Sequence, residues 1–277
     1  MEYSRVDEFL SIWNTGMKQN SRRNFLKETL MVAAVAPIGA LLPSQPGVAS
    51  EAIKIIHFFA RKKGLTPKQF VNYWLRVHGA MTLKLPGRFS GYVLANAINL
   101  PDDLQPDAIV GVSESFSPNA SARAETLSSP QAKALVADQD NFVGKSLTFT
   151  TKEHVFVPRP HPTNGALKRV LITVRRDGMT HDQFVQGWLE NYGPAARGIA
   201  GLQGFILSEI TAKGKDADPL PLGEIDGIQE AWWRGSDVPR PSPGLAKLRT
   251  EGDKLFDRTR CVSLIVRDNL LIPPHYG

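Results

Sequence analysis

The feature that most constrains the fold of this chain is an internal repeat. The decapeptide FVNYWLRVHG begins at Phe70, and FVQGWLENYG begins 114 residues later, at Phe184. At the same offset IKIIHFFARKKGLTPKQF aligns with LKRVLITVRRDGMTHDQF, so each copy opens with a β-rich apolar run, a basic pair and a glycine turn. We therefore expect two structurally equivalent halves.

Both copies predict a helix that begins in the same way. Thr66 and Gln69 have the spacing of a capping box, in which the threonine side chain accepts from the N3 amide and the glutamine reaches back. Thr180 and Gln183 repeat this spacing. The helix is therefore expected to start directly after each threonine.

An apolar stripe follows each cap. Phe70, Trp74 and His78 fall on one helical face of the first copy, and Tyr192 takes the place of the histidine in the second. The glycine that comes next in each copy, Gly79 in the first, predicts the end of the helix. His78 is therefore expected at the C-terminal end of its helix, on the side that faces the core.

The remaining periodicity predicts the order β-α-β-β-α-β in each half. Strands are expected at residues 89–98, 107–116, 146–157, 202–211, 225–234 and 260–272, and helices near residues 120–137 and 244–256. This order is the ferredoxin-like plan, so the predicted class is α+β with two tandem ferredoxin-like units. The expected domains are residues 51–160 and 161–277, joined by the Pro- and Gly-containing linker 158–165.

The N-terminal residues 1–50 are expected to be a twin-arginine signal peptide. SRRNFLK at residues 21–27 has the paired arginines, residues 30–42 form an apolar stretch, and the small residues 48–50 suit a signal peptidase. The apolar stretch is too short to span a bilayer. We therefore expect the twin-arginine machinery as a partner, a periplasmic or secreted location and no stable membrane span after cleavage. The true start is left open between Met1 and Met17.

Charge and cysteine content exclude several classes of site. The formal net charge is +6, but the basic residues are scattered, and strands with the aromatic pairs of an RNA-binding sheet are missing, so nucleic acid is not an expected partner. Cys261 is the single cysteine, which excludes an intrachain disulfide. The six histidines show no metal-binding spacing, so no metal is expected.

The repeated pattern G-[LM]-T-x3-F-x3-W-x3-[HY]-G, with an aspartate near the third strand, resembles the EthD family of dimeric α/β-barrel proteins. The resemblance implies that the two units pack through their sheets as an intramolecular barrel. It also implies chemistry on small molecules, mostly without metal or organic cofactor, by His and Tyr in a pocket between helices and sheet. The same superfamily contains haem-binding relatives, so a haem stays open as a less favoured alternative.

Four residues of the first copy are the predicted catalytic group. His78 matches the recurrent family position, and His57 on the first strand corresponds to Leu171 in the second copy. Imidazole is the side chain best suited to proton transfer near neutral pH. Tyr92 and Asp107 on the following strands are expected as polar supports.

Four further residues are candidates for substrate binding. Trp74 lies on the apolar stripe, where a core role competes with a pocket role, and Tyr192 takes the position of His78 in the second copy. Trp232 is half of a tryptophan pair on a strand, which places one ring on each face of the sheet. Arg61 at a strand end suits a carboxylate or a solvated rim.

The sequence thus predicts an exported protein that acts on a small hydrophobic or aromatic molecule by acid-base chemistry of lyase, isomerase or cyclase type. Two alternatives remain open: a binding or carrier protein without turnover, and a haem-dependent oxidoreductase. The substrate and the oligomeric state, including a homo-oligomer, are also left open.

Overall fold

The first half of the chain builds one β-α-β-β-α-β unit. The structure is a computed structural model that describes residues 52–87, 89–101, 103–161, 166–234 and 242–274; the predicted export signal lies outside these residues. The strands are β1 (Ile53–Arg61), β2 (Gly91–Ala97), β3 (Ile109–Ser117) and β4 (Val143–Val157). The helical segments are α2 (Pro67–Tyr73), the π-helical η1 (Trp74–His78), α3 (Gly79–Thr82), α4 (Ala120–Ser128), α5 (Pro130–Asp138) and the 3-10 turn η2 (Gln139–Asn141).

The second half repeats this order, and its described residues after β7 form one helix where the first half has two. Its strands are β5 (Ala166–Thr173), β6 (Leu202–Lys213), β7 (Gly227–Arg234) and β8 (Val262–Ile272). Its helical segments are α6 (His181–Gly187), the π-helical η3 (Trp188–Tyr192), α7 (Gly193–Ala195), the 3-10 turn η4 (Ala196–Gly198) and α8 (Pro243–Leu255). None of the helices in the described ranges combines the length and apolar character that a membrane crossing requires.

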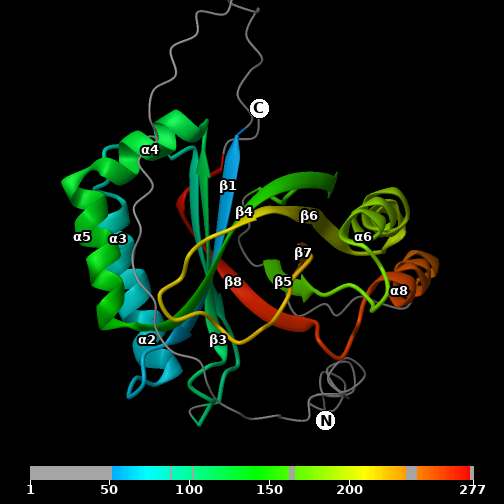
Figure 1. The fold of residues 1–277 in the computed structure, drawn as a ribbon, viewed down its shortest axis with the longest axis horizontal. Coiled ribbons are helices and arrows are strands. Elements are labelled where there is room, and N and C mark those ends of the chain that lie inside the picture. The colour runs from blue at the N-terminus through cyan, green and yellow to red at the C-terminus, as the bar shows by residue number, and fades with distance from the viewer. Residues whose placement is uncertain (1–51, 88, 102, 162–165, 235–241, 275–277) are drawn as a thin grey trace, which may run out of the picture. The chain divides into compact units, whose positions relative to one another are not determined.

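The strands of the two halves form one closed antiparallel barrel in the order β1-β3-β2-β8-β5-β7-β6-β4 (Figure 1). Within each half the sheet order is that of a ferredoxin-like unit, β4-β1-β3-β2 and β8-β5-β7-β6. The halves join at their sheet edges, where β2 pairs with β8 and β4 pairs with β6. The predicted α+β class and the intramolecular barrel of two ferredoxin-like units are therefore confirmed.

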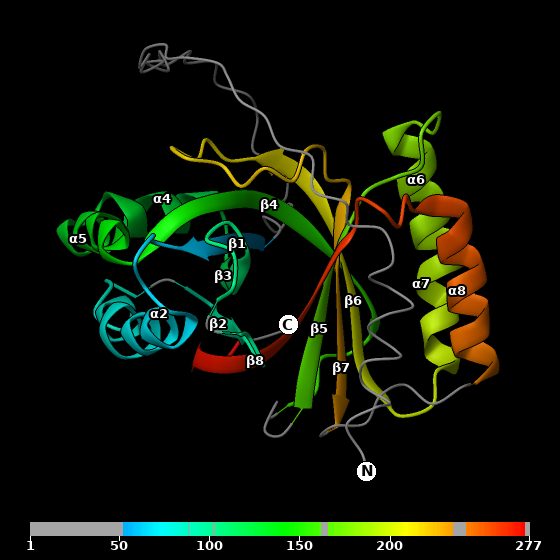
Figure 2. The same cartoon turned by 90° about the horizontal axis from the view of Figure 1, so that it is seen from below.

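Helices cover the outside of the barrel in two layers. Figure 2 shows α2, α4 and α5 beside the strands of the first half, and α6, α7 and α8 beside the strands of the second. The inner faces of both sheets share one apolar core, which includes Ile56, Phe58, Val112, Val170 and Ile228. Each sheet therefore covers the bare face of the other, and each outer face packs against its own helices.

Both predicted capping boxes are present. Gln69 N donates to Thr66 Oγ1 at 3.2 Å, and Thr66 N donates to Gln69 Oε1 at 2.8 Å. Thr180 and Gln183 repeat these bonds at 3.2 and 2.9 Å. Both helices accordingly start directly after the threonine.

The predicted end of these helices is wrong. Gly79 and Gly193 have helical φ values of −59° and −56°, and the chain continues as a helix beyond each of them. The five residues before each glycine, Trp74–His78 and Trp188–Tyr192, form a π-helical turn, which inserts one extra residue into the helix. His78 therefore lies inside a continuous helical segment and not at its C-terminus.

The two glycines allow close packing. A Cβ atom on Gly193 would lie 2.2 Å from Cζ of Phe156, so the Phe156 ring would have to shift to make room for a side chain. A Cβ atom on Gly79 would lie 3.3 Å from Cδ1 of Leu94, which is tighter than ordinary van der Waals contact. Glycine at this point of the repeat is explained by the approach of the sheet to the helix.

Candidate functional site

Polar side chains gather on the helix-facing side of the first sheet. His57 of β1 lies opposite Ser113 of β3 and opposite Thr148 of β4. Tyr92 of β2 lies opposite Ser115, which shares a face with Ser113 because alternate residues of a strand point the same way. His57 Nδ1 lies 3.3 Å from Thr148 Oγ1. The strand register therefore places His57 and Tyr92 on one face of the sheet.

The helical layer adds His78 with a set of hydrogen-bond partners. His78 Nδ1 lies 2.9 Å from Asp138 Oδ2 at the end of α5, and the Tyr73 hydroxyl donates to the other carboxylate oxygen at 2.6 Å. Asn141 Nδ2 donates to Asp138 Oδ1 at 3.0 Å. The imidazole packs edge-on against Phe142 with ring centroids 4.9 Å apart, and His78 is 2% exposed. The ring is therefore fixed in position by one carboxylate and one aromatic ring.

The hydrogen bonds around Asp138 determine the tautomer of His78. Burial alone would raise the pKa of the Asp138 carboxyl, but bonds from its three partners hold that pKa below its usual value. An ionised carboxylate only accepts, so Nδ1 of His78 carries the proton and donates it. Burial lowers the pKa of His78 and outweighs the opposing effect of Asp138. At neutral pH His78 is therefore a neutral imidazole whose Nε2 has a free lone pair for a proton.

His57 and Tyr92 complete what we call the polar cluster: His57, His78, Tyr92 and Asp138. Burial lowers the pKa of His57 to about 4, and the positive charge of Arg123 adds to this effect. Burial raises the pKa of Tyr92, although hydrogen bonds to Thr82 and Ser113 oppose it. Both residues are half-buried, whereas His78 is buried. At neutral pH the cluster holds neutral imidazoles beside a protonated phenol.

The helix-facing layer of the second half also holds buried polar side chains, Arg169 and Gln229, but it has no histidine at the positions equivalent to His57 and His78. The equivalent positions are His57 and Leu171, His78 and Tyr192, and Tyr92 and Phe205. Leu171, Tyr192 and Phe205 all belong to one buried core. The single polar group of this set, the Tyr192 hydroxyl, donates to Gln229 Oε1. At these three pairs of equivalent positions, imidazole is thus found in the first half alone.

Two of the predicted site residues make their contacts elsewhere. The Asp107 side chain is 51% exposed, and its carboxylate lies 3.0 Å from Lys145 Nζ. Arg61 is 8% exposed, and its guanidinium donates to the backbone carbonyls of Leu104 and Gln105. Arg61 therefore supports the chain that leads into β3, and neither residue contributes to the polar cluster.

The predicted aromatic binding residues are core residues in this structure. Trp74 is fully buried and packs on Gly111, where an added Cβ atom would lie 2.5 Å from its ring. Tyr192 lies in the core of the second half. Trp232 is also fully buried, and its Nε1 donates to Asp268 Oδ2 at 2.9 Å. The competing core interpretation of Trp74 fits its position.

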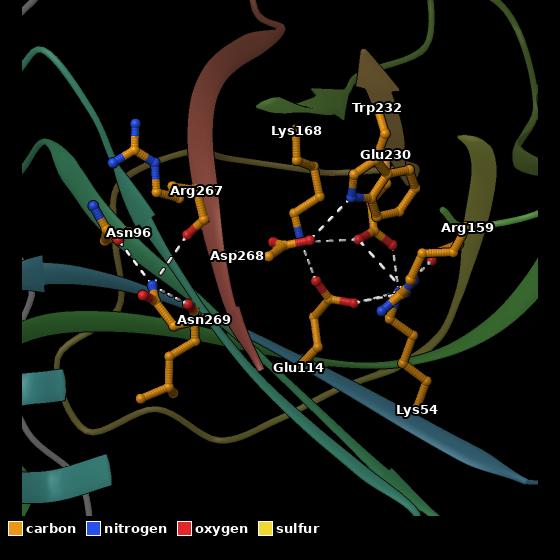
Figure 3. Close-up of polar contacts among 12 residues, drawn as sticks. Lys54, Asn96, Glu114, Arg159, Lys168, Glu230, Trp232, Arg267, Asp268 and Asn269 are labelled. Carbon is orange, nitrogen blue, oxygen red and sulfur yellow. Dashed lines mark hydrogen bonds and ion pairs between the residues drawn. The ribbon is translucent and has the colours of Figure 1, made fainter. Parts of the chain in front are cut away.

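Within the barrel lies a buried ion-pair network that the sequence patterns did not predict (Figure 3). Its members are Lys54, Glu114, Glu153, Arg159, Lys168, Glu230 and Asp268. Lys54 Nζ lies 3.0 Å from Glu114 Oε2 and 2.8 Å from Glu153 Oε1, and it also pairs with Glu230 of the second half. Arg159 Nη2 lies 3.0 Å from Glu114 Oε2. One lysine therefore bridges carboxylates of both halves.

Lys168 is the counterpart of Lys54 and makes the reciprocal set of pairs. It pairs with Glu114 of the first half, and its Nζ lies 3.4 Å from Glu230 Oε1 and 2.8 Å from Asp268 Oδ1. Burial lowers the pKa of each lysine, but the surrounding carboxylates outweigh it and raise the pKa above its usual value. Both lysines are therefore charged and link the halves at the barrel centre.

The two central glutamates differ in protonation tendency. Burial alone would raise the pKa of Glu114, but the three cations hold it well below its usual value. Burial and the negative charge of Glu114 raise the pKa of Glu230. The sequence signal for this network was a charge at the same place in each copy of an otherwise apolar strand, as in VGVSESF and IQEAWW.

The surroundings of His78 do not fit a haem. Its Nδ1 is held by Asp138, and the imidazole is packed against Phe142 with 2% of the residue exposed, so a porphyrin would have to displace the aromatic ring. In the described part of the chain, no group of three or more His, Cys, Asp or Glu side chains is placed to hold a metal ion.

Comparisons with known proteins agree with this architecture. The model of the EthD domain matches residues 62–146, which lie in the first half. No match to a curated protein was found.

Solved structures share the fold at low sequence identity. A candidate monooxygenase from Fusobacterium nucleatum is 8% identical, with 80% of this chain and 94% of that chain covered and a TM-score of 0.53. A candidate monooxygenase from Lactobacillus acidophilus is 10% identical, with coverage of 79% and 95% and a TM-score of 0.51. An anthrone oxidase-like protein is 6% identical, with coverage of 79% and 93% and a TM-score of 0.53. At these identities the likeness concerns the fold alone. Residues 62–146 thus match the model of the EthD domain, and they lie in a closed antiparallel barrel formed by both halves.

Proposed function

We propose that the protein is an acid-base catalyst that acts on a small hydrophobic or aromatic carbonyl compound without an organic cofactor, in a reaction of lyase, isomerase or cyclase type. The observation that supports this most is the His78 and Asp138 pair, placed in the same layer as Tyr92 and half-buried His57. Neutral imidazole and protonated phenol are the forms needed to remove a proton from carbon and to stabilise the resulting oxyanion.

The proposed step is an enolisation. Nε2 of His78 accepts the proton from the carbon next to the carbonyl, the C–H electron pair moves into the new carbon–carbon double bond, and the carbonyl oxygen becomes an enolate oxygen. Tyr92 donates a hydrogen bond to that oxygen. Asp138 stabilises the imidazolium that forms, because its carboxylate already accepts from Nδ1. His57 assists as a second neutral imidazole on the same face.

Deuterium incorporation tests this step even when the final product of the reaction is unidentified. Compounds that copurify with the protein are identified by mass spectrometry, and each carbonyl compound is incubated with the protein in D2O. We expect exchange at the carbon next to the carbonyl, and a loss of about 100-fold or more in His78→Ala, as is typical when a general base is removed. Exchange that persists at the wild-type rate in a folded His78→Ala protein would contradict the proposed role.

The second half offers a matched control. Tyr192→Phe removes a buried hydroxyl at the position equivalent to His78, and we expect the exchange rate to stay unchanged. Asp138→Asn should reduce the rate while keeping the size of the side chain, because a neutral amide no longer stabilises the imidazolium.

Binding without turnover is the second candidate, and the low exposure of His78 favours it. A ligand that binds equally well to wild type and His78→Ala, with no exchange in either, would select this function. A Soret band in the purified protein would contradict both candidates.

Export by the twin-arginine pathway is part of the proposal. It is supported by the paired arginines Arg22 and Arg23 and the apolar stretch that follows them. Replacement of both arginines by lysine should retain the protein in the cytoplasm, and cell fractionation measures this. Unchanged export of the double-lysine variant would contradict it.

A further inference from the structure

A surface groove lies where the helix layer of the first half meets the seam between β2 and β8. It has a volume of about 1010 Å³. Its walls are the exposed side of α2 and η1, the segment from Asn96 to Leu100 after β2, and Arg267 of β8. Figure 3 shows Arg267 and Asn96 on this seam. We call this site the seam groove.

The charged residues among the described lining of the seam groove are all cations. Lys68 and Arg76 come from the helix and Arg267 comes from the second half, whereas none of the described lining residues is acidic. All three are exposed, and within the described ranges none of them forms a salt bridge. Three cations facing one hollow without counterions form a favourable environment for an anion.

The second half shows that the helix does not need these cations. At the offset of the repeat, Asp182 takes the place of Lys68 and Glu190 takes the place of Arg76. The helix forms in both halves with the same capping box and the same π-helical turn. The positive charge is therefore a specific property of the first half and not a requirement of the fold.

The remaining lining combines apolar and amide groups. Val71, Leu75 and Ile98 supply apolar surface, and Asn72 and Asn99 supply amides. Asn99 has a φ of +57°, the only positive φ of a non-glycine residue in the described part of the chain. A residue held in this region is often found at a binding site.

We propose that the seam groove binds a small amphipathic anion, with an aromatic or aliphatic body on the apolar lining and one carboxylate, sulfonate or phosphate facing Lys68, Arg76 and Arg267. The volume is near the upper end of the range for small-molecule sites. The site is separate from the polar cluster and does not depend on the proposed catalysis.

Two fluorescent probes of nearly equal shape test this proposal. 8-Anilinonaphthalene-1-sulfonate carries the negative charge, and N-phenyl-1-naphthylamine has the same aromatic body without it. We expect the sulfonate to bind at least tenfold more tightly than the neutral probe, as a single charge-assisted contact of about 1.4 kcal/mol would give. Lys68→Asp with Arg76→Glu should remove this difference, while the affinity of the neutral probe stays the same.

The double variant should fold, because both replacements copy the second half. Lys84→Asp with Lys247→Glu is the matched control: it changes the net charge equally, at two exposed lysines outside the groove. This control, like His78→Ala, should keep the wild-type affinity for the sulfonate. Arg267→Glu alone should weaken sulfonate binding severalfold. Equal losses in the groove variant and the control, or no loss in either, would overturn the proposal.

Discussion

The helix-facing layers of the two halves share a backbone plan and differ in chemistry. Both contain a capping box, a π-helical turn and a tryptophan packed on a glycine. In the first half this layer holds His57, His78 and Tyr92, whereas Leu171, Tyr192 and Phe205 fill the same places in the second. The comparison shows that this layer packs without imidazoles at the positions of His57 and His78 and without a hydroxyl at the position of Tyr92. The fold therefore does not require these three polar groups, and the proposed chemistry gives them a role.

The barrel interior contrasts with these layers, because there the two halves remain alike. Lys54 and Lys168, and Glu114 and Glu230, occupy equivalent places and pair across the halves. A change at one member leaves buried charges of the other half uncompensated. Residues of the interior network can therefore be replaced only together with their partners in the other half, whereas each outer layer can change on its own.

The largest expected effect is from Lys168→Met, which tests the equivalence of the interior. The substitution removes a cation that three buried carboxylates share, and loss of one partner of a buried pair costs about 3–5 kcal/mol. Lys54→Met should reduce the free energy of unfolding by a similar amount, as measured by urea denaturation at pH 7. The surface variant Lys247→Met is the control with almost no change. If the free energy of unfolding falls by less than about 1 kcal/mol in either lysine variant, the two lysines do not contribute equally to the network.

The second-largest expected effect is a loss of stability in acid that comes from the helix-facing layer of the first half and not from that of the second. The pKa of His57 is about 4 in the folded protein and 6.5 in the ordinary reference, so the unfolded chain binds a proton between these values while the folded chain does not. The free energy of unfolding therefore falls as the pH drops from about 6.5 to 4, by up to about 3 kcal/mol from this residue. His57→Leu, which copies the second half, should remove this part of the loss. If the free energy of unfolding of the variant and of the wild type depends on pH in the same way, His57 is not held in its neutral form in the folded protein.

Glycine substitutions test whether the packing of a tryptophan on a glycine is equally tight in both halves. A Cβ atom on Gly111 would lie 2.5 Å from the Trp74 ring, and one on Gly227 would lie 2.4 Å from the Trp188 ring. Each Gly→Ala change should cost about 1–3 kcal/mol through overpacking, with similar values in both halves. Gly87→Ala has no atom within 4 Å and serves as the control. If thermal unfolding shows that the destabilisation by Gly111→Ala and by Gly227→Ala differs by more than about 2 kcal/mol, the packing in the two halves is not equivalent.

The smallest stability effect is expected from Tyr92→Phe, which again copies the second half. The lost hydroxyl bonds to Thr82 and Ser113, so the change should cost about 1 kcal/mol or less. The proposed exchange reaction should nevertheless slow markedly, because the enolate oxygen loses its donor. Unaltered exchange with an identified compound would remove Tyr92 from the proposed step.

Much of the fold could be predicted from the repeat. The capping residues fix where the helices begin, and the offset between copies identifies two units of equal plan. The helix end could not be predicted, because Gly79 and Gly193 are selected by their contacts with Leu94 and Phe156, which lie far away in the sequence. A glycine does not mark the end of a helix when close tertiary packing is the reason that glycine occupies the position.

The candidate site was predicted in part. His57, His78 and Tyr92 share one layer because strand alternation and helical periodicity are local properties that the sequence records. Asp138 was missed, since its partnership with His78 depends on how α5 lies over the helix that carries the histidine. Asp107 was placed in the site by strand order alone, but its side chain is exposed and pairs with Lys145.

The position of β8 has a consequence for how the chain folds. This strand lies between β2 and β5, so it closes one seam of the barrel and completes the second sheet at the same time. The edge strand β2 cannot form its pairs with β8 until residues 266–272 have been synthesised, and this pairing joins residues that lie far apart in the described chain. Long-range pairing of this kind slows folding. Until then β2 presents an open edge, and a nascent chain in that state is exposed to aggregation or chaperone capture.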